Sequence, residues 1–254
     1  MNQLARLNSL AAMAEMELRR LKHDPFEIIT RAVQPILWIA VFGSVMAKVR
    51  AFSSVGDYIT FITPGVILQS STFIALAYGI ALIFERESGI LKKLLASPLP
   101  RSYVVIGRAL AGGIRASTQY VIVLVSAVIV GARIVSNPLN LITGYLALVI
   151  ACMGFTGISI LVASLLKTRE RFMGIIGAIT MPLFFASNAL YPIDIMPDTI
   201  KYISLVNPLT YTVSALRKLL VSNSYDITQE LLVIVIFTTL ALGASVKSLR
   251  RIVE

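Results

Sequence analysis

Few residues in this chain have side chains that could carry out catalysis, and they are too scattered for it. The 254 residues include one histidine, His23, and one cysteine, Cys152. A multi-ligand metal site and a disulfide each need more such side chains than that. No Gly-Lys pair occurs, so the phosphate-binding loop that ends in Gly-Lys-Ser or Gly-Lys-Thr is absent. We therefore predict no catalytic residue, no metal ligand and no ATP site of that type.

Two pairs of carboxylates have a spacing that acid–base chemistry could use, Glu85 with Glu87 and Asp194 with Asp198. Arg86 separates the members of the first pair, and the residues that follow predict that this pair begins a helix. The partial positive charge at a helix N-terminus stabilises acidic residues there. The first pair is therefore predicted to be structural, and no enzyme activity is expected.

The segment 85–98 is the most informative part of the chain. Its acidic start, its two lysines and its closing Pro98 predict a short helix that stops at the proline. Its apolar side chains gather on one face of that helix: Ile90, Leu91, Leu94 and Leu95. Two interpretations fit this pattern. The helix either packs on the membrane surface, or fits a cleft on another protein and moves the two adjoining spans.

The composition is typical of a membrane protein. Hydrophobic residues make up 57% of the chain, charged residues make up 14%, and the mean hydropathy is +0.82, whereas soluble domains are about a quarter charged. The net charge of +10 comes from short basic clusters between apolar stretches. Because these clusters form no stripe on a soluble face, no nucleic-acid partner is expected. The sequence predicts an all-α integral membrane protein.

Six apolar stretches are near or above the length of about 20 residues with which a helix crosses a bilayer. They are residues 28–47, 59–84, 104–132, 138–165, 172–193 and 229–246. Residues 1–22 place leucine and alanine at helical spacing with charged residues off that stripe, which predicts an amphipathic helix on the membrane surface. A solvated helix is the alternative. One transmembrane domain is expected over residues 1–254.

The basic residues predict the orientation in the membrane. Fourteen of the 23 lysines and arginines lie on the side that carries both termini and the segments after spans two and four, and six lie on the other side. The remaining three, Arg31, Arg108 and Arg115, lie at span ends on the richer side, and the third span is expected to enter the membrane near Arg115. Cytoplasmic loops are enriched in Lys and Arg, so both termini are predicted to be cytoplasmic.

Residues 194–218 interrupt the pattern of spans. The stretch 191–198, where this region begins, has two prolines and two aspartates, and the apolar stretch 200–206 is too short to cross a membrane. Asn207-Pro208 is a turn signal before a second helical pattern at 209–220. We predict two short helices that dip into the outer leaflet as a re-entrant hairpin. An external loop that lies on the membrane is the alternative.

The segment 85–98 resembles the cytoplasmic coupling motif of the type-2 ABC exporter permeases, in which Glu-Arg-Glu precedes a Gly and a Leu-Leu-Ala-Thr/Ser-Pro ending. Ile90 and Lys92 stand where that family usually has Thr or Ser and Glu. Two later stretches also resemble family signatures: Ala189-Leu190-Tyr191-Pro192, and Asn207-Pro208-Leu209-Thr210-Tyr211 followed by Ala215-Leu216-Arg217. The likeness covers essentially the whole chain in length, span number and motif order.

The resemblance implies roles for the residues that carry it. Coupling to an ATPase is implied for Glu85, Arg86, Glu87, Gly89, Ile90, Leu91, Leu94, Leu95, Ser97 and Pro98. The re-entrant signature is implied for Tyr191, Pro192, Asn207, Pro208, Leu209, Thr210, Tyr211 and Arg217. The polar residues of spans two and five are our own candidates to line a pathway: Gln69, Ser70, Thr72, Tyr78, Thr180 and Asn188. Hydrogen bonding between neighbouring helices is their alternative role.

The resemblance also implies a function in the plasma membrane. Two permeases, identical or related, would pair with two cytoplasmic ABC ATPase subunits that bind ATP and Mg²⁺, and this chain would bind no cofactor. The first and fifth spans would form much of the seam between the permeases. The exported substrate would be amphipathic or lipid-like: a drug, an antibiotic, a lipid or a lipid-linked glycan. The alternatives are a membrane scaffold without transport and an ion-coupled carrier, although the latter would want acidic residues at mid-span.

Overall fold

The computed structural model describes residues 15, 19, 23, 25–49, 57–91, 100–166 and 168–250. Within these residues all the regular secondary structure is helical, which confirms the all-α prediction. In chain order the elements are α2 (Pro25–Leu37), the π-helix η1 (Trp38–Gly43), α3 (Ser44–Val49), α4 (Tyr58–Ala77), α5 (Ile80–Glu87), α7 (Arg101–Val130), α8 (Pro138–Leu165), α9 (Arg169–Phe185), the 3-10 helix η2 (Ile193–Ile195), α10 (Asp198–Val206), α11 (Pro208–Leu220) and α12 (Thr228–Arg250).

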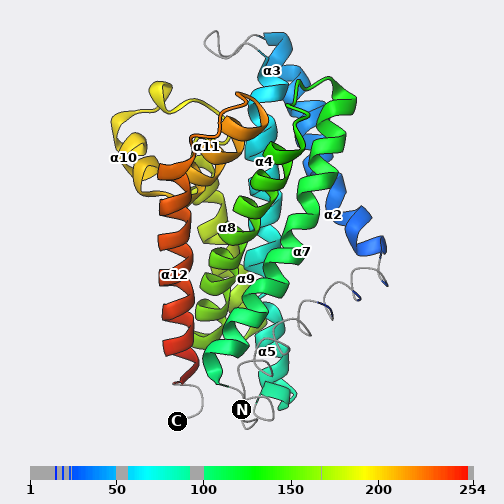
Figure 1. Ribbon diagram of the computed structural model, residues 1–254. Helices are drawn as coiled ribbons and strands as arrows, with labels where there is room; N and C mark the ends of the chain where they lie inside the picture. The colour runs from blue at the N-terminus through cyan, green and yellow to red at the C-terminus, as the bar shows by residue number, and fades with distance from the viewer. Residues whose placement is uncertain are drawn as a thin grey trace.

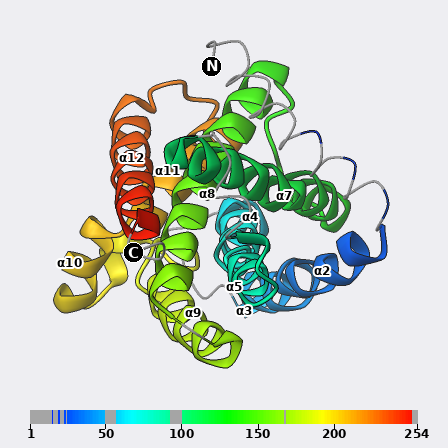
Figure 2. The same ribbon diagram turned by 90° about the horizontal axis from the view of Figure 1, so that it is seen from below.

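The long helices run along one another as a bundle (Figure 1). α8 lies at the centre, where it packs against α12, α7, α4 and α11. Seen along the bundle, α2 lies at one edge and α10 at another (Figure 2). One large cluster of buried apolar side chains, to which α4, α7, α8 and α11 all contribute, forms the core.

Five helical stretches among the described residues are long and apolar enough to cross a membrane. They are Thr30–Val49, Tyr58–Glu87, Arg101–Val130, Pro138–Leu165 and Thr228–Leu249. These stretches correspond to predicted spans one, two, three, four and six. α8 has the predicted bounds 138–165, because Asn137 caps its first turn by accepting a hydrogen bond from the Leu139 amide and Pro138 occupies its first position.

The fifth predicted span, 172–193, has the wrong bounds. α9 runs Arg169–Phe185, carries charged residues in its first turn, and is not among the five stretches. The helix ends because the chain turns sharply over residues 186–189. The Ala186 amide bonds back to the Pro182 carbonyl, and the Ser187 hydroxyl donates to the Phe184 carbonyl at 2.7 Å. Polar side chains thus fix a turn inside a stretch whose hydropathy predicts a continuous span.

The first span contains the π-helix. Pro35, in α2, has no backbone N–H and therefore cannot donate to the carbonyl one turn earlier. The π-helix η1 begins three residues later, and such widened turns are rare and frequently lie at functional sites. Its Trp38 ring lies 6.2 Å from the Phe184 ring of α9, centroid to centroid. The first span and α9 are therefore in contact through aromatic side chains.

The second span is broken at Tyr78–Gly79, between α4 and α5. The Gly79 amide leaves the helical ladder and donates to the Ser159 hydroxyl of α8 at 2.8 Å, and that hydroxyl donates to the Leu76 carbonyl. A Cβ atom on Gly79 would lie only 2.6 Å from the Ser159 carbonyl oxygen. The break is therefore held by α8, and the close approach requires glycine.

Two short helices occupy most of the region 194–218. α10 and α11 confirm the predicted pair of helices, and Asn207 separates them as predicted. Both lie at the end of the bundle that carries α3, opposite the end that carries α5 (Figure 1). Of the predicted amphipathic helix 1–22, only Glu15 and Arg19 are described; both are helical, and the Arg19 guanidinium pairs with the Glu15 carboxylate at 2.7 Å.

Candidate functional site

Glu85, Arg86 and Glu87 lie in the last turn of α5, which ends the second span. The prediction that Glu85 begins a separate helix is therefore wrong. The chain turns at Ser88–Gly89, where Gly89 has a φ of +73°, a left-handed conformation that glycine adopts readily and that commonly ends helices. Helical structure resumes at Ile90. The motif thus ends α5 instead of starting a helix.

Each of these three residues contacts a different helix. The Glu85 carboxylate pairs with Arg108 of α7, and the Glu87 carboxylate pairs with Arg169, the first residue of α9. The Arg86 guanidinium donates to the Leu166 carbonyl at the end of α8, at 3.2 Å. One turn of α5 therefore connects α7, α8 and α9 at this end of the bundle. We refer to these three contacts as the α5 bracket.

The two ion pairs of the bracket compensate for the unfavourable position of Glu85 and Glu87 in the last turn of a helix. Acidic residues in the last turn of a helix lie near its partial negative charge, which destabilises them. The side chains of Arg108 and Glu85 are 13% and 27% exposed, so solvent screens this pair little. Arg169 and Glu87 are 40% and 43% exposed, and an exposed pair contributes only about 0–1 kcal/mol. The pair between Glu85 and Arg108 is thus the stronger constraint.

Other residues assigned to the coupling segment are only partly described. Leu91 is buried at 1% exposure, whereas Ile90 is 55% exposed. Leu94, Leu95, Ser97 and Pro98 lie outside the described residues. No described atom lies within 4 Å of a Cβ built on Gly89, so a larger side chain there would be resisted by the backbone conformation and not by a neighbour.

At the opposite end of the bundle, Asn207 connects α9 to α11. Its Oδ1 atom accepts from the Leu209 amide at 3.0 Å and so caps α11, with Pro208 at the first helical position. Its Nδ2 atom donates to the Leu183 carbonyl at 2.7 Å and to the Ala186 carbonyl at 3.3 Å. The Asn-Pro pair thus begins one helix and pairs the free carbonyls at the end of another.

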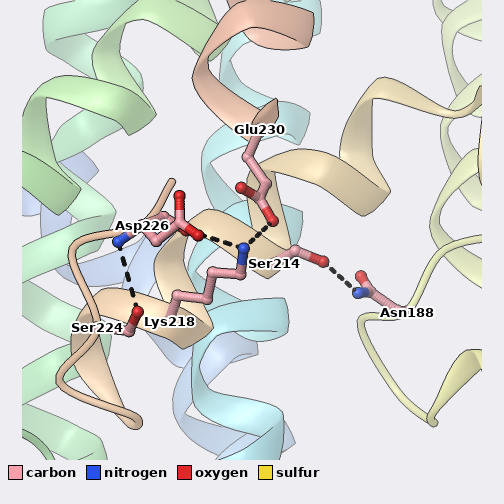
Figure 3. Close-up of polar contacts among 6 residues, drawn as sticks. All are labelled: Asn188, Ser214, Lys218, Ser224, Asp226 and Glu230. Atoms are coloured by element: carbon pink, nitrogen blue, oxygen red, sulfur yellow. Dashed lines mark hydrogen bonds and ion pairs between the residues drawn. The ribbon is translucent and has the colours of Figure 1, made fainter. Parts of the chain in front are cut away.

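Arg217 of α11 lies in a compact polar cluster with the turn after α9. Its Nη2 atom donates to the Asn188 carbonyl at 2.8 Å, and its guanidinium lies 3.9 Å from the centroid of the Phe61 ring of α4. Burial lowers the pKa of this guanidinium to about 10, so it stays protonated at neutral pH. Asn188 Nδ2 in turn donates to the Ser214 hydroxyl at 2.8 Å (Figure 3). These contacts hold α4, α11 and the turn together.

The remaining residues of the predicted re-entrant signature also pair within this end of the chain. The Tyr191 hydroxyl donates to the Phe185 carbonyl, and the Tyr211 hydroxyl donates to the Leu205 carbonyl at 2.7 Å. The Thr210 and Ser204 hydroxyls lie 3.0 Å apart, and Leu209 is buried. The turn also approaches α4 closely, since a Cβ on Gly65 would lie 2.8 Å from Ala189 Cα. Tyr191, Thr210 and Tyr211 therefore each have a partner within this end of the chain.

The six candidate pathway residues lie in α4, in α9 and in the turns that follow these two helices. Gln69 and Thr72 are buried in α4, and the Ser70 hydroxyl donates to the Val66 carbonyl of its own helix at 2.8 Å. The Thr180 hydroxyl donates to the carbonyl one turn earlier in α9 at 2.6 Å. Asn188 belongs to the cluster around Arg217, and Tyr78 lines a cavity of about 510 Å³.

Sequence reasoning missed several residues that complete these contacts. Arg108, Arg169 and Ser159 are distant in sequence from their partners, and nothing in their local patterns marks them. Lys218 was counted only as a basic residue, yet its Nζ atom lies 2.7 Å from the Glu230 carboxylate and 2.9 Å from the Asp226 carbonyl oxygen (Figure 3). This pair joins α11 to the first turn of α12. The sequence signal that could have predicted this pair is a lysine and a glutamate that lie twelve residues apart on the two sides of a loop.

Comparison with known proteins finds similarity over most of the chain. Residues 8–221 match the family model described as ABC-2 type transporter. The chain is 31% identical to a protein named as a transport permease, ycf38, of Cyanophora paradoxa, over 86% of this chain and 81% of that protein. It is 29% identical to a protein named as a multidrug ABC transporter permease, YbhR, of Escherichia coli K12, over 61% of this chain and 42% of that protein. It is 23% identical to the daunorubicin resistance ABC transporter permease protein DrrB1 of Streptomyces coeruleorubidus, over 78% of this chain and 70% of that protein.

Proposed function

The chain belongs to the ABC-2 type transporter family, and from that premise we propose that it is the membrane-spanning subunit of an ATP-driven exporter. It is a multi-pass membrane protein with several apolar helices, like relatives that are named as permeases. Two ATPase subunits on separate chains would supply the energy, with ATP and Mg²⁺ bound there. The sequence of this chain has no Gly-Lys pair from which to build a phosphate-binding loop.

The α5 bracket is the observation that carries this proposal. A force applied by an ATPase near Ile90 would act on the chain just after Glu87. Because Glu85, Arg86 and Glu87 contact α7, α8 and α9, the motion would reach several helices at once. We place the ATPase contact on the segment 85–98, in which Ile90 is 55% exposed. A helix that only packed on the membrane surface would not need two ion pairs and a hydrogen bond that tie it to three neighbours.

The end of the bundle that carries α5 faces the cytoplasm in this proposal, and the membrane is the plasma membrane. The basic residues that favour this orientation include Arg86, Arg101 and Arg169. The same orientation places α10 and α11 at the outer surface. Both chain termini are then cytoplasmic.

We also propose that α9 is the fifth of six spans and that α10 and α11 form a hairpin in the outer leaflet. α9 has 17 residues, or about 26 Å at 1.5 Å per residue, and hydrocarbon is about 30 Å thick. The exposed apolar residues of α10 support contact with lipid, since Tyr202 is 73% and Val206 is 84% exposed. The contacts of Asn207 and Arg217 would shield the irregular backbone of this hairpin.

A second permease copy, identical or related, completes the transporter in this proposal. The first span presents an exposed apolar row, with Val33, Leu37 and Val41 each more than half exposed. α9 has exposed Met181 and Phe185 near the first span. An exposed apolar face shared by the first span and α9 supports their place at the seam between two copies.

The proposed cargo is an amphipathic or lipid-like molecule, such as a drug, an antibiotic, a lipid or a lipid-linked glycan. Gln69, Ser70, Thr72, Tyr78, Thr180 and Asn188 are the proposed polar lining of its path. Two relatives support this class, because their names refer to multidrug transport and to daunorubicin resistance. Two other functions compete with this proposal: a scaffold without transport, and an ion-coupled carrier.

The test is to purify the tagged chain from its own membranes in mild detergent and to identify its partner. We expect an ABC ATPase to co-purify and the complex, reconstituted in nanodiscs, to hydrolyse ATP, whereas the isolated chain should hydrolyse none. The Glu85→Arg variant should lose most of the substrate-stimulated hydrolysis, because Arg108 would then face a like charge. The exchanged pair Glu85→Arg with Arg108→Glu should recover it.

The other results separate the competing functions. Purification without any ATPase would favour a scaffold, and solute accumulation driven by an ion gradient would favour a carrier. Stimulated hydrolysis that is unchanged in Glu85→Arg would contradict the role of the α5 bracket. Glu170→Arg is the matched control, because Glu170 is an exposed acidic residue next to Arg169 that takes no part in the bracket.

A further inference from the structure

Three polar side chains are buried without hydrogen bonds where α4 packs against α7: Ser71 and Thr72 of α4, and Gln119 of α7. Ser71 and Gln119 are fully buried, and Thr72 is 1% exposed. Both hydroxyl oxygens and both polar atoms of the Gln119 amide have no partner among the described residues. Buried polar groups are nearly always paired, because an unpaired one is destabilising. We refer to these three side chains as the Gln119 layer.

The layer lies near the middle of the membrane. The Arg133 amide donates to the Thr60 hydroxyl at 2.7 Å, so the start of α4 lies beside the end of α7. Ser71 is eleven residues after Thr60, and Gln119 is eleven residues before Val130, the last residue of α7. Because α4 and α7 run in opposite directions, both residues lie about 16 Å from that contact. Hydrocarbon is about 30 Å thick, so no water is available at this depth unless the bundle admits it.

Helical spacing directs these side chains toward neighbouring helices. Eleven residues are about three turns, so Ser71 lies on the same side of α4 as Thr60, which faces the end of α7. A Cβ atom on Gly112 would lie 2.7 Å from the Thr156 side chain of α8. Gln119 lies two turns after Gly112 on the same side of α7. The layer is therefore located where α4, α7 and α8 pack together.

Other hydroxyls in these helices are paired within their own helix. Thr63 and Ser70 of α4 donate to carbonyls of the preceding turn at 2.7 and 2.8 Å, and Thr180 of α9 does so at 2.6 Å. Ser71 follows Ser70 directly, yet its hydroxyl has no partner. The layer thus departs from the pattern of the rest of the chain. Local departures of this kind are typical of functional sites.

α4 has a point at which it can bend on each side of the layer. Pro64, seven residues before Ser71, lacks the N–H group that would complete the helical ladder. Gly79, eight residues after Ser71, donates to Ser159 of α8 and so interrupts the second span. Helices bend at such points. The part of α4 between Pro64 and Gly79 can therefore move away from α7 without the loss of further backbone hydrogen bonds.

We propose that the contact between α4 and α7 opens and closes at the Gln119 layer. The structure shows the closed state, in which the layer is dry and unpaired. In the open state α4 bends away from α7, and water enters and pairs with Gln119, Ser71 and Thr72. The closed state leaves polar groups unpaired and the open state exposes apolar neighbours, so the two states are close in free energy. This opening lies inside one copy of the chain, apart from the proposed seam between two copies.

The unfolding temperature of Gln119→Met tests whether the amide is unpaired in the closed state. Methionine has the same unbranched length without the amide, so it removes an unpaired group and keeps the packing. We expect the full-length protein in detergent to unfold at a temperature about 2–4 °C higher. Asn140→Leu is the matched control. Asn140 is also fully buried, but its amide donates to the Leu219 carbonyl at 2.9 Å and to Asn223 Oδ1 at 2.8 Å, so its loss should lower the unfolding temperature.

A cysteine in the layer tests the opening itself. Ser71→Cys is made together with Cys152→Ala, and the full-length protein in lipid nanodiscs is treated with a small, water-soluble methanethiosulfonate. This reagent attacks the thiolate, which forms only where water reaches the sulfur. We expect Ser71→Cys to react faster than Ala163→Cys, a control in the core of α8 that is 1% exposed. Addition of Gln119→Met should slow the reaction of Ser71→Cys about ten-fold, because it favours the closed state.

Three results would overturn the proposal. A lower unfolding temperature for Gln119→Met, and equally for Gln119→Leu, would show that the amide makes stabilising hydrogen bonds. Equal reaction rates for Ser71→Cys and Ala163→Cys would show that the layer opens no more readily than the rest of the core. A reaction of Ser71→Cys that Gln119→Met leaves unchanged would show that the amide does not control the opening. None of these measurements needs ATP or a partner chain, so their failure and the failure of the exporter proposal are separate results.

Discussion

At the scale of single residues, this apolar chain uses a few polar side chains to hold helix ends that the backbone leaves unpaired. The last carbonyls of a helix such as α9 have no partner within the helix. Asn207 donates to two of them, at Leu183 and Ala186, while its other atom caps α11. One side chain therefore fixes where two helices meet.

A substitution can separate the two roles of Asn207. Asn207→Asp keeps an acceptor for the Leu209 amide but loses the donor and brings a negative charge to two carbonyl oxygens. We expect Asn207→Asp to destabilise the detergent-purified protein at least as much as Asn207→Ala, by about 1–3 kcal/mol, the cost of unpaired buried polar groups. Thermal unfolding measures this change.

Asn137 provides the matched control for this prediction, because it also precedes a proline and caps a helix. Its Oδ1 atom accepts from the Leu139 amide at 3.0 Å, but its amide donates to the hydroxyl of Tyr225 at an exposed site. Asn137→Asp should therefore unfold near the wild-type temperature. If Asn207→Asp were equally stable, Asn207 would be only a cap and its contact with α9 would contribute nothing.

At the scale of helices, the break in the second span is built by its neighbour. The Gly79 amide bonds to Ser159 of α8 and not to its own helix, and the next turn is closed by a hydrogen bond from Leu82 to Gly79 at 3.0 Å. The segment from Tyr58 to Glu87 is apolar enough to be one helix. Contact with α8 overrides that local preference, and it sets the direction in which α5 carries Glu85 and Glu87.

Because Gly79 lies so close to α8, we expect that a single methyl group added at this position destabilises the protein. In Gly79→Ala the new Cβ would overlap the Ser159 side chain and its carbonyl oxygen, so α5 and α8 would have to separate. We expect a loss of about 1–3 kcal/mol of stability, as for other overpacked sites. Gly243→Ala in α12 should be neutral or stabilising, because no described atom lies within 4 Å of its Cβ. Similar unfolding temperatures for the two variants would show that the break tolerates rearrangement.

At the scale of the whole molecule, the lengths of the apolar stretches predicted that the long helices exist. They predicted less well where each helix ends and which residues it contacts. α8 could be predicted to the residue because Asn137-Pro138 begins it and no charged residue interrupts it. The end of α9 could not be predicted in this way, because it depends on a contact with Asn207, which lies more than twenty residues later in the chain. The resemblance drew attention to Glu85 and Glu87, yet their partners lie 23 and 82 residues away. Such contacts leave no local pattern in a sequence.

The two ends of α8 provide a test of how the whole molecule crosses the membrane. α8 has 28 residues, or about 42 Å, which exceeds the hydrocarbon thickness of about 30 Å. Ser136 is exposed before α8, and Thr168 is half-buried after it. If α8 spans the membrane, cysteines at these two positions must lie on opposite sides. The excess of basic residues near Arg169 and Arg171 predicts that Thr168 is the cytoplasmic one.

We expect Ser136→Cys to react with a membrane-impermeant maleimide in intact cells, and Thr168→Cys to react only after the membrane is permeabilised. Background labelling should be negligible, because Cys152, the one native cysteine, is fully buried in α8. The reversed pattern would leave the fold intact but invert the orientation, so the α5 bracket would face away from any cytoplasmic ATPase and the proposed coupling would fail. Reaction of both cysteines in intact cells would mean that α8 does not cross the membrane, because a helix that spans it cannot present both ends to the same side.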